Sequence, residues 1–446
     1  MTRDLRKQAL GLESGKTVSR KARSKQGTPS TSRGNSMGPS RGGSRVPSRN
    51  ASDDDEDESG DAMQWGTNST DDMIAPEDVD EAPEAWISGF NERIDEICDR
   101  KRSSVQGREE SLIAFISYLT RHFAQQEVKV KVNELLPALL KSVKAGQTER
   151  ETVLALKAIA LLLITDPSDT VYDMVAGPIK NTITDAQHPA AKIAAIHALG
   201  VATFYGGATI EETEDVMDFY LDVATSDGAV VEEPDNAEIV TAALEEWGFL
   251  ATQLDDMEES AEVAMETFVD QLESSDVDVQ IAAGENIALL FEKSHTEAES
   301  DDEPEAEDEA GEVDGHHAGP RMIKRYTVYR QQHLLQQTLE ELAKASSKRL
   351  SKKDRKQLHL AFNDILNTVE KPTRGPRYST ALDEEGREMG SRMKVAIHGG
   401  ARMIIDAWWK LHRLNGLKRV LQGGFLVHYE FNQVVFDSLP VMVEED

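Results

Sequence analysis

The sequence predicts an all-α fold of the armadillo or HEAT type, a solenoid in which helix pairs stack side by side. The main observation is a set of five similar helical segments between residues 111 and 291, each with an alanine at the same place. Successive alanines are 41, 40, 48 and 40 residues apart: Ala114, Ala155, Ala195, Ala243 and Ala283. Arrays with about 40 to 47 residues per repeat are built from two or three helices per unit.

A second observation is the larger apolar residue that stands four positions after each of these alanines. Residues four apart lie on the same face of a helix, so each segment presents one small and one bulky side chain together. The bulky residues are Tyr118, Ile159, Leu199, Trp247 and Ile287. One helix pair cannot bury its own apolar face, so we expect neighbouring repeats to bury it. An ordinary helical bundle with accidental spacing is the alternative.

Residues 1–84 are predicted to be disordered, because serine, glycine, arginine, proline and acidic residues dominate them. Residues 1–50 hold 12 Lys and Arg against 2 Asp and Glu, whereas residues 51–84 hold 14 acidic residues and no Lys or Arg. The basic part has two interpretations: it contacts RNA phosphates, or it is a solvated tail without a specific partner.

The armadillo/HEAT-like helical repeat domain is expected to cover residues 85–296. Thr148 and Glu151 have the spacing of a capping box at the start of the second segment, and Pro189 suits the first turn of the third. The 48-residue step contains an insertion, residues 225–236, that we expect to lengthen a loop. His197 stands on an otherwise apolar helix, where we expect a histidine of the core or groove rather than a ligand.

Residues 193–292 carry 25 acidic residues and no Lys or Arg. The default interpretation is a set of solvated helix faces. Alternatively, this surface turns away from nucleic acid or holds a basic partner, for which the basic C-terminal part of the same chain is a candidate. The sequence does not separate these alternatives.

An acidic linker is expected at residues 297–320, followed by a small, mainly helical, basic module at residues 321–446. Residues 321–424 hold 22 Lys and Arg against 10 Asp and Glu. A basic stripe on a helix is typical of phosphate binding, which makes six residues candidates for RNA or ribosome binding: Lys348, Arg349, Lys352, Lys353, Arg355 and Lys356. The stripe has two other interpretations, a nuclear import signal and an ordinary exposed helix face.

Arg402 and Lys410 complete the candidate residues for RNA or ribosome binding. They lie in a segment that we expect to form a short strand at Met393–Ile397, a turn, and an amphipathic helix at Ala401–Leu414. The N-terminus of that helix follows two glycines and is suited to an anion.

Composition excludes several classes of function. One cysteine, Cys98, permits no intramolecular disulfide and fits a reducing compartment. The N-terminus has no apolar secretory region, and no apolar run is long enough for a bilayer. We therefore expect a soluble protein of the cytoplasm, with the nucleus as a second location, and no membrane partner. We find neither a metal-ligand pattern nor a catalytic set, so we expect no enzyme activity, cofactor, metal or small-molecule substrate.

Several stretches resemble the interferon-related developmental regulator family. The most specific is Asp276–Glu292, which closely follows the family's signature at the end of its helical repeats. Further matches are Asp354–Gln357 with Phe362–Leu366, then residues 399–410, and then residues 420–442. Together the resemblance covers about residues 85–443.

The resemblance implies an armadillo-type helical protein without enzymatic activity. Members of the family are linked to transcriptional co-regulation and to binding idle ribosomes, so that translation is held off. This chain differs from the animal pattern by a longer loop, residues 373–392, and by the absence of an Arg/Lys-rich tail after Asp446. We therefore expect any ribosome contact to be made by the basic helix and the N-terminal Arg-rich segment.

Two functions compete on these grounds. The first is an RNA-associated translational regulator that docks on the ribosome or ribosomal RNA through its basic C-terminal half. The second is a protein–protein scaffold that acts as a nuclear transcriptional co-regulator and binds regulatory proteins in the groove of the helical array. They differ in how strongly binding depends on salt.

Overall fold

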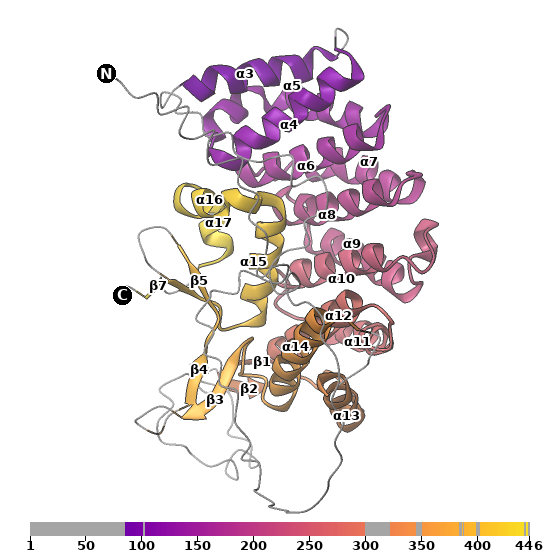
Figure 1. Cartoon of the computed structure of the whole chain (residues 1–446), viewed down its shortest axis with the longest axis vertical. Coiled ribbons are helices and arrows are strands. Elements are labelled where there is room, and N and C mark those ends of the chain that lie inside the picture. Colours follow the sequence, from indigo (N-terminus) through magenta and orange to yellow (C-terminus); the bar gives the residue numbers. More distant parts are fainter. Residues whose placement is uncertain are drawn as a thin grey trace, which may run out of the picture. The chain divides into compact units, whose positions relative to one another are not determined.

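The structure is a computed structural model that describes residues 85–100, 103–298, 322–344, 350–382, 386, 388–397, 402–440 and 443–444. This part of the chain is a solenoid of paired α-helices with a few short strands, so the predicted all-α array is confirmed (Figure 1). The tail predicted to be disordered, residues 1–84, and most of the predicted acidic linker lie outside the described residues.

Within the described residues, six helices form a central row in which each helix packs against the next. The first five are the helices expected from the alanine spacing, and the sixth follows the linker. In order they are α4 (Val105–Arg121), α6 (Glu149–Thr165), α8 (Pro189–Tyr205), α10 (Ala237–Ala251), α12 (Val277–Lys293) and α14 (Lys352–Glu370). Because α14 packs on α12, the array continues past residue 296.

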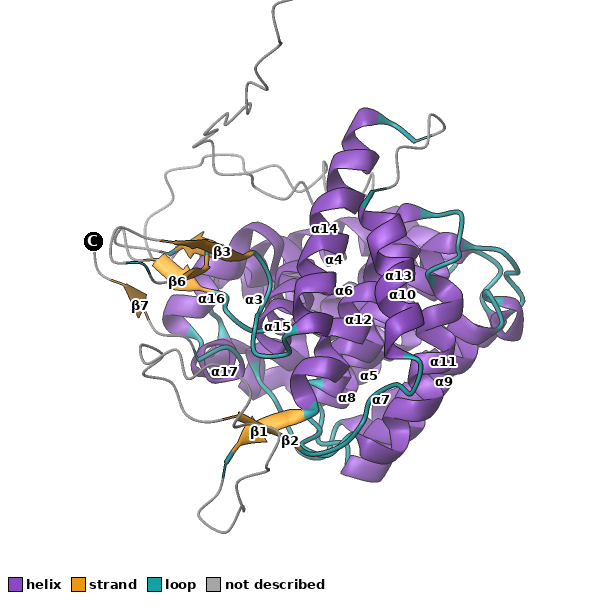
Figure 2. Cartoon of the chain, turned by 90° about the horizontal axis from the view of Figure 1, so that it is seen from below, coloured by secondary structure: helices purple, strands orange, loops and turns teal. Residues whose placement is uncertain are grey.

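An outer row of helices supplies the partner of each central helix. Each outer helix comes just before its partner in the chain and packs against it. They are α3 (Ala85–Cys98), α5 (Gln125–Lys144), α7 (Tyr172–Asp185), α9 (Ile210–Thr225), α11 (Glu258–Gln271) and α13 (Gln332–Ala343). Figure 2 shows the short strands gathered on one side of these helices.

Burial confirms the register of the alanines. Four of them are fully buried, and so are the bulky residues four positions later: Ala155 with Ile159, Ala195 with Leu199, Ala243 with Trp247, and Ala283 with Ile287. Ala114 and Tyr118 are only half-buried. This difference follows from the position of α4 in the first described pair, which has a neighbouring repeat on one side only.

The insertion at residues 225–236 forms a bridge within the outer row. It contains the 3-10 turn η3 (Ala229–Val231), which contacts both α7 and α9. Lys192 of α8 is almost fully buried, and its Nζ donates to the carbonyl of Thr184 at 3.0 Å and to the carbonyl of Val231. Because one ammonium group joins the two carbonyls, the turn is fixed to the α7–α8 pair.

Short antiparallel strands accompany the last repeats. Among the described residues they form two two-stranded sheets and one three-stranded sheet with β6 in the middle. The strands are β1 (His295–Glu297) with β2 (Met322–Lys324), β3 (Tyr378–Leu382) with β4 (Glu388–Ser391), and β5 (Lys394–Ala396), β6 (Arg402–Ile404) and β7 (Val443–Glu444). The expected strand at Met393–Ile397 is confirmed as β5.

The helix expected at Ala401–Leu414 is wrong in its first half. Residues 402–404 form β6, and the helix α15 runs from Trp408 to Leu421. Met403 is fully buried opposite Val395 of β5, so its apolar side chain is satisfied by a sheet partner. Short apolar runs do not distinguish strand from helix by periodicity, which explains the error. The chain then continues through η6 (Gln422–Gly424), α16 (Phe425–Phe431) and α17 (Gln433–Ser438).

The register leads to a stability prediction. Replacing Ala283 by Asp places a carboxylate where the alanine side chain is fully buried. We expect a loss of more than about 3 kcal/mol in the free energy of unfolding, measured by chemical denaturation. The control is Ala190→Asp, at an exposed position in the first turn of α8, where a negative charge is favourable. Equal stabilities for the two variants would show that the register is misassigned.

Candidate functional site

The C-terminal arm, which we define as residues 402–440, lies across the central row. Its helix α15 packs on α10, α12 and α6, while η6 and α16 pack on α4 and α17 packs on α6. The arm therefore runs back from the last repeats toward the first (Figure 1). The face of the array that a binding groove would use is occupied by the chain itself.

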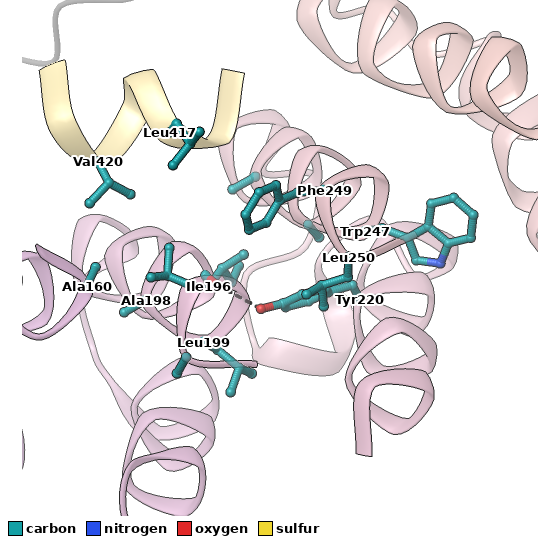
Figure 3. Packing of buried hydrophobic residues seen from close by; sticks show 14 of the residues in the cluster. Ala160, Ile196, Ala198, Leu199, Tyr220, Trp247, Phe249, Leu250, Leu417 and Val420 are labelled. Atoms are coloured by element: carbon teal, nitrogen blue, oxygen red, sulfur yellow. Dashed lines mark hydrogen bonds between the residues drawn. The ribbon is translucent and has the colours of Figure 1, made fainter. Parts of the chain in front are cut away.

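Apolar side chains form the centre of this contact. Leu417 and Val420 of α15 point toward Ala160, Ile196 and Phe249 of three central helices, and all five belong to one buried cluster (Figure 3). The close approach requires small residues on the array. A Cβ at Gly248 would lie 2.2 Å from Oδ1 of Asn286 and 2.5 Å from Nδ1 of His412.

Glu292, near the end of α12, fixes the start of the arm helix. Its carboxylate accepts hydrogen bonds from the backbone N–H groups of Trp408, at 2.6 Å, and Trp409, at 3.1 Å. These N–H groups have no partner within α15, because they belong to its first turn. Burial raises the pKa of Glu292 to about 7, although the two N–H donors favour the ionised form.

Arg419 joins α15 to the acidic part of the array. Its guanidinium pairs with Glu245 at 2.9 Å and with Glu246, which also contacts Nδ1 of His197 at 2.9 Å. Burial lowers the pKa of Arg419, but the two carboxylates outweigh it and the net shift is upward. The alternative in which the acidic region holds the chain's own basic part is therefore confirmed here, and His197 is a groove histidine as expected.

Further arm side chains bind the C-terminal ends of central helices. His428 contacts the Leu119 carbonyl of α4 through Nε2 at 2.7 Å, and Asn432 donates to the Ile164 carbonyl of α6 at 2.9 Å. Arg413 donates to the Thr252 carbonyl, directly after α10, at 2.9 Å. Carbonyls at helix C-termini lack intrahelical partners, so these side chains act as caps supplied from far along the chain.

The basic stripe is found at the start of α14. Lys352, Lys353 and Lys356 are exposed, whereas Arg355 is half-buried and its Nε lies 3.5 Å from the Ser351 carbonyl oxygen. We refer to residues 351–356 as the basic turn. Two of the predicted site residues, Lys348 and Arg349, lie outside the described residues.

Carboxylates stand close to the basic turn. Gln357 donates to Oδ1 of Asp278, at the start of α12, at 3.4 Å. Burial raises the pKa of Asp278, and the nearby carboxylates of Asp276, Glu245 and Asp354 raise it further. The exposed lysines are therefore bordered by negative charge on the side of the array, and the accessible positive surface faces away from α12.

Arg402 and Lys410 do not join the basic turn. Arg402 is exposed on β6, and Lys410 is paired with Asp406, with its Nζ 5.6 Å from the ring centre of Trp409. The neighbouring Trp408 donates from its ring N–H to Thr368, in the last turn of α14, at 2.7 Å. The 16 residues between Lys352 and Thr368 span roughly 24 Å of helix. The predicted site residues thus form two separate groups.

Sequence reasoning missed the side chains that hold the arm, although a signal for its position was present. Small residues stand five positions after the alanine in the last four of the look-alike helices, and all are buried: Ala160, Gly200, Gly248 and Ala288. Small residues at the same position of successive helices allow another backbone to approach closely. The pattern does not show which segment of the chain approaches them.

Metal sites and membrane-spanning helices can be assessed in the part of the chain that the structure describes. No group of three or more His, Cys, Asp or Glu side chains there is placed to hold a metal ion. Among the same residues, no helix combines the length and apolar character needed to cross a membrane.

Comparison with known proteins gives a family match. The Interferon-related developmental regulator (IFRD) family matches residues 51–370. An uncharacterised protein of Schizosaccharomyces pombe is 27% identical over 349 residues, which are 77% of this chain and 72% of that protein. Interferon-related developmental regulator 1 of Sus scrofa is 24% identical over 332 residues, and that of Homo sapiens is 23% identical over 326 residues. Each match covers 70% of this chain but 63%, less than two-thirds, of the mammalian protein.

The contact between the arm and α4 can be tested at two adjacent glycines. A Cβ at Gly424 would lie 1.8 Å from the Thr120 carbonyl oxygen, whereas a Cβ at Gly423 has no neighbour within 4 Å. We expect Gly424→Ala to destabilise the protein by about 1–3 kcal/mol, because backbone has to shift, and to speed proteolytic cleavage within the arm. Gly423→Ala is the matched control and should behave as wild type. Identical melting and cleavage of the two variants would contradict the contact.

The arm contact also predicts a dependence on pH. Burial raises the pKa of Glu285 to about 8 and that of Glu292 to about 7, above the value of an exposed glutamate. The stability from such groups is complete below the pKa of an exposed glutamate, about 4.3, and is lost progressively as the pH rises to the folded-state pKa. We therefore expect these two carboxyl groups to lower the melting temperature as the pH rises from about 4.5 to 8, with the clearest fall between about pH 6.5 and 8. Glu292→Gln should flatten this fall, since glutamine keeps an acceptor for Trp408 without ionising.

The arm histidines affect stability only below about pH 6.5, in the lower part of this range. Burial lowers the pKa of His412 to about 4 and also lowers that of His428, so the stability that the neutral histidines contribute is lost only as the pH falls below about 6.5.

The control for Glu292→Gln is Glu266→Gln, at an exposed position on α11, which should leave the pH dependence of the melting temperature unchanged. A wild-type profile for Glu292→Gln would disprove the role of Glu292.

Proposed function

This chain belongs to the interferon-related developmental regulator family, and from that premise we propose that it is a regulatory protein that binds the ribosome or ribosomal RNA. The observation that carries the proposal is the basic turn. Its three exposed lysines lie within the first five residues of α14, the last described helix of the central row. Exposed lysines grouped on one turn suit phosphate contacts, which release condensed counterions.

The basic turn is the stronger of the two groups of predicted site residues. Lys352, Lys353 and Lys356 have accessible side chains, whereas the Lys410 side chain is 14% exposed and already paired with Asp406. Arg402 lies on β6, outside the basic turn. The proposed ribosome contact therefore centres on the basic turn, and Arg402 could extend it only on a large RNA surface.

A second candidate function is a protein–protein scaffold that acts as a nuclear transcriptional co-regulator. The outer surface of α9 and α11 favours it, because exposed carboxylates of both helices face away from the central row: Glu211, Glu214, Asp215, Asp218, Asp222, Glu258, Glu259, Glu262, Glu266 and Asp270. A regulatory protein with a basic surface fits that side. Since the arm covers the central row, the scaffold would use the outer row instead of the groove.

We infer that the protein acts by binding and not by catalysis. The best-defined buried charges at the arm contact have structural partners: Glu292 accepts from the N–H groups of α15, and Arg419 pairs with Glu245. Action on ribosomes places the protein in the cytoplasm, and action as a co-regulator places it in the nucleus.

The phosphate contacts can be tested by charge reversal. The variant Lys352→Glu, Lys353→Glu, Lys356→Glu should lose co-sedimentation with purified ribosomes, and the salt dependence of the remaining binding should weaken. Its melting temperature should stay close to wild type, because exposed charges contribute little to stability. The matched control reverses three exposed lysines of α5, Lys129, Lys141 and Lys144, and should bind normally.

Three results of this experiment have distinct meanings. Wild-type co-sedimentation of the variant would disprove the phosphate contacts. Absence of ribosome binding in the unaltered protein would favour the scaffold. Normal binding in lysate together with exclusion from the nucleus would identify the stripe as an import signal.

A further inference from the structure

A four-residue pattern, Lys-Arg-x-Ser, occurs twice in the chain. One copy ends at Ser351 and the other at Ser104. Both serines are exposed, and each is the N-cap residue of a central helix, Ser351 of α14 and Ser104 of α4. Two basic residues at the third and second positions before a serine match the charge pattern that basophilic serine kinases select.

We propose that Ser351 is a phosphorylation site for a basophilic serine kinase, and that the added phosphate silences the basic turn. The claim that phosphorylation silences the basic turn rests on the proposed binding of ribosomes by that turn. The claim that Ser351 is phosphorylated does not, because it depends only on the sequence pattern and on the accessibility of one hydroxyl group.

The start of α14 can open for a kinase without exposing a fully buried side chain. Ser351 has extended backbone angles, φ −63° and ψ 162°, and its side chain accepts a hydrogen bond from Asp354 N–H at 3.1 Å. The first fully buried side chain of the helix is that of Leu358. Fraying of the first turn therefore exposes no fully buried side chain, and a kinase has to release only the partly buried Leu350, directly before Ser351, from the edge of the core.

The reaction is an ordinary phosphoryl transfer. Oγ of Ser351 forms a bond to the γ-phosphorus of a nucleoside triphosphate, and the bond from that phosphorus to the bridging oxygen of the β-phosphate breaks. The hydroxyl proton passes to a base of the kinase. The products are phosphoserine and a nucleoside diphosphate.

The phosphate would change the charge of the basic turn directly. It adds about 1.5 to 2 negative charges at pH 7, against the three exposed lysines of the turn. The guanidinium of Arg355, whose Nε lies 3.5 Å from the Ser351 carbonyl, is close enough to pair with it. A negative group at a helix N-terminus is also favourable, so α14 should persist while its cations become less available to RNA.

Ser104 supplies an internal control. It has the same pattern before it and the same cap geometry, with its Oγ accepting from Gly107 N–H at 3.0 Å. The residues after it, Val105 and Gln106, carry no positive charge. Phosphorylation of Ser104 should therefore leave the binding of ribosomes and of heparin by the basic turn unchanged.

The test uses the full chain with the purified catalytic subunit of cyclic-AMP-dependent protein kinase and MgATP. Mass spectrometry should locate phosphate on Ser351, and Ser351→Ala should abolish it there. The modified protein should bind ribosomes about tenfold more weakly and elute from heparin at lower salt. Ser351→Asp should show part of the effect and Ser104→Asp none. In the variant Lys352→Glu, Lys353→Glu, Lys356→Glu, phosphorylation should change neither measurement further.

The possible failures are distinguishable. Lack of phosphate on Ser351 overturns the inference and leaves the proposed function standing. Phosphate on Ser351 with unchanged elution from heparin overturns the silencing of the basic turn. If the unmodified protein does not sediment with ribosomes, the proposed function fails, and elution from heparin alone decides whether Ser351 controls the turn.

Discussion

The arrangement of this protein depends on the unpaired carbonyl groups at the C-terminal ends of the central helices. The last carbonyls of a helix have no partner within it, and stacking places several such ends where water has little access. The arm supplies one polar side chain to each of three ends: His428 to α4, Asn432 to α6 and Arg413 to α10. Leaving such a group buried and unsatisfied costs about 1–3 kcal/mol, so backbone chemistry as well as apolar packing determines where the arm lies.

The acidic region of the sequence acquires two different roles in the structure. Glu245, Glu246 and Glu292 face the arm, where they pair with Arg419 or bind the first turn of α15. The carboxylates on the outer surface of α9 and α11 remain accessible. The same composition thus serves intramolecular binding on one side and presents a charged surface on the other. The sequence-based default of solvated faces is right for the outer row and incomplete for the central row.

The array could be predicted because its information is local and periodic. Ala155, Ala195, Ala243 and Ala283 are buried at one register, since the same packing problem is solved in each repeat. The position of the arm could not be predicted, because it depends on pairs such as His428 with Leu119, which are distant in sequence and have no repeating spacing. Of the candidate site, the exposed lysines of α14 were predictable from helical spacing. The pairing of Lys410 with Asp406 and the strand at Arg402 required the tertiary structure.

The arm also alters how the solenoid responds to strain. In a simple repeat protein each unit contacts only its neighbours, so its stability is a sum of repeat and nearest-neighbour terms. The ends of such an array can therefore unfold separately from the rest. Here α15 touches α12 and α10 while α16 touches α4, which joins repeats at both ends of the array through one segment. Stretching or twisting the array must first release that segment. Such a brace favours a single cooperative transition and a stiff body instead of a flexible superhelix.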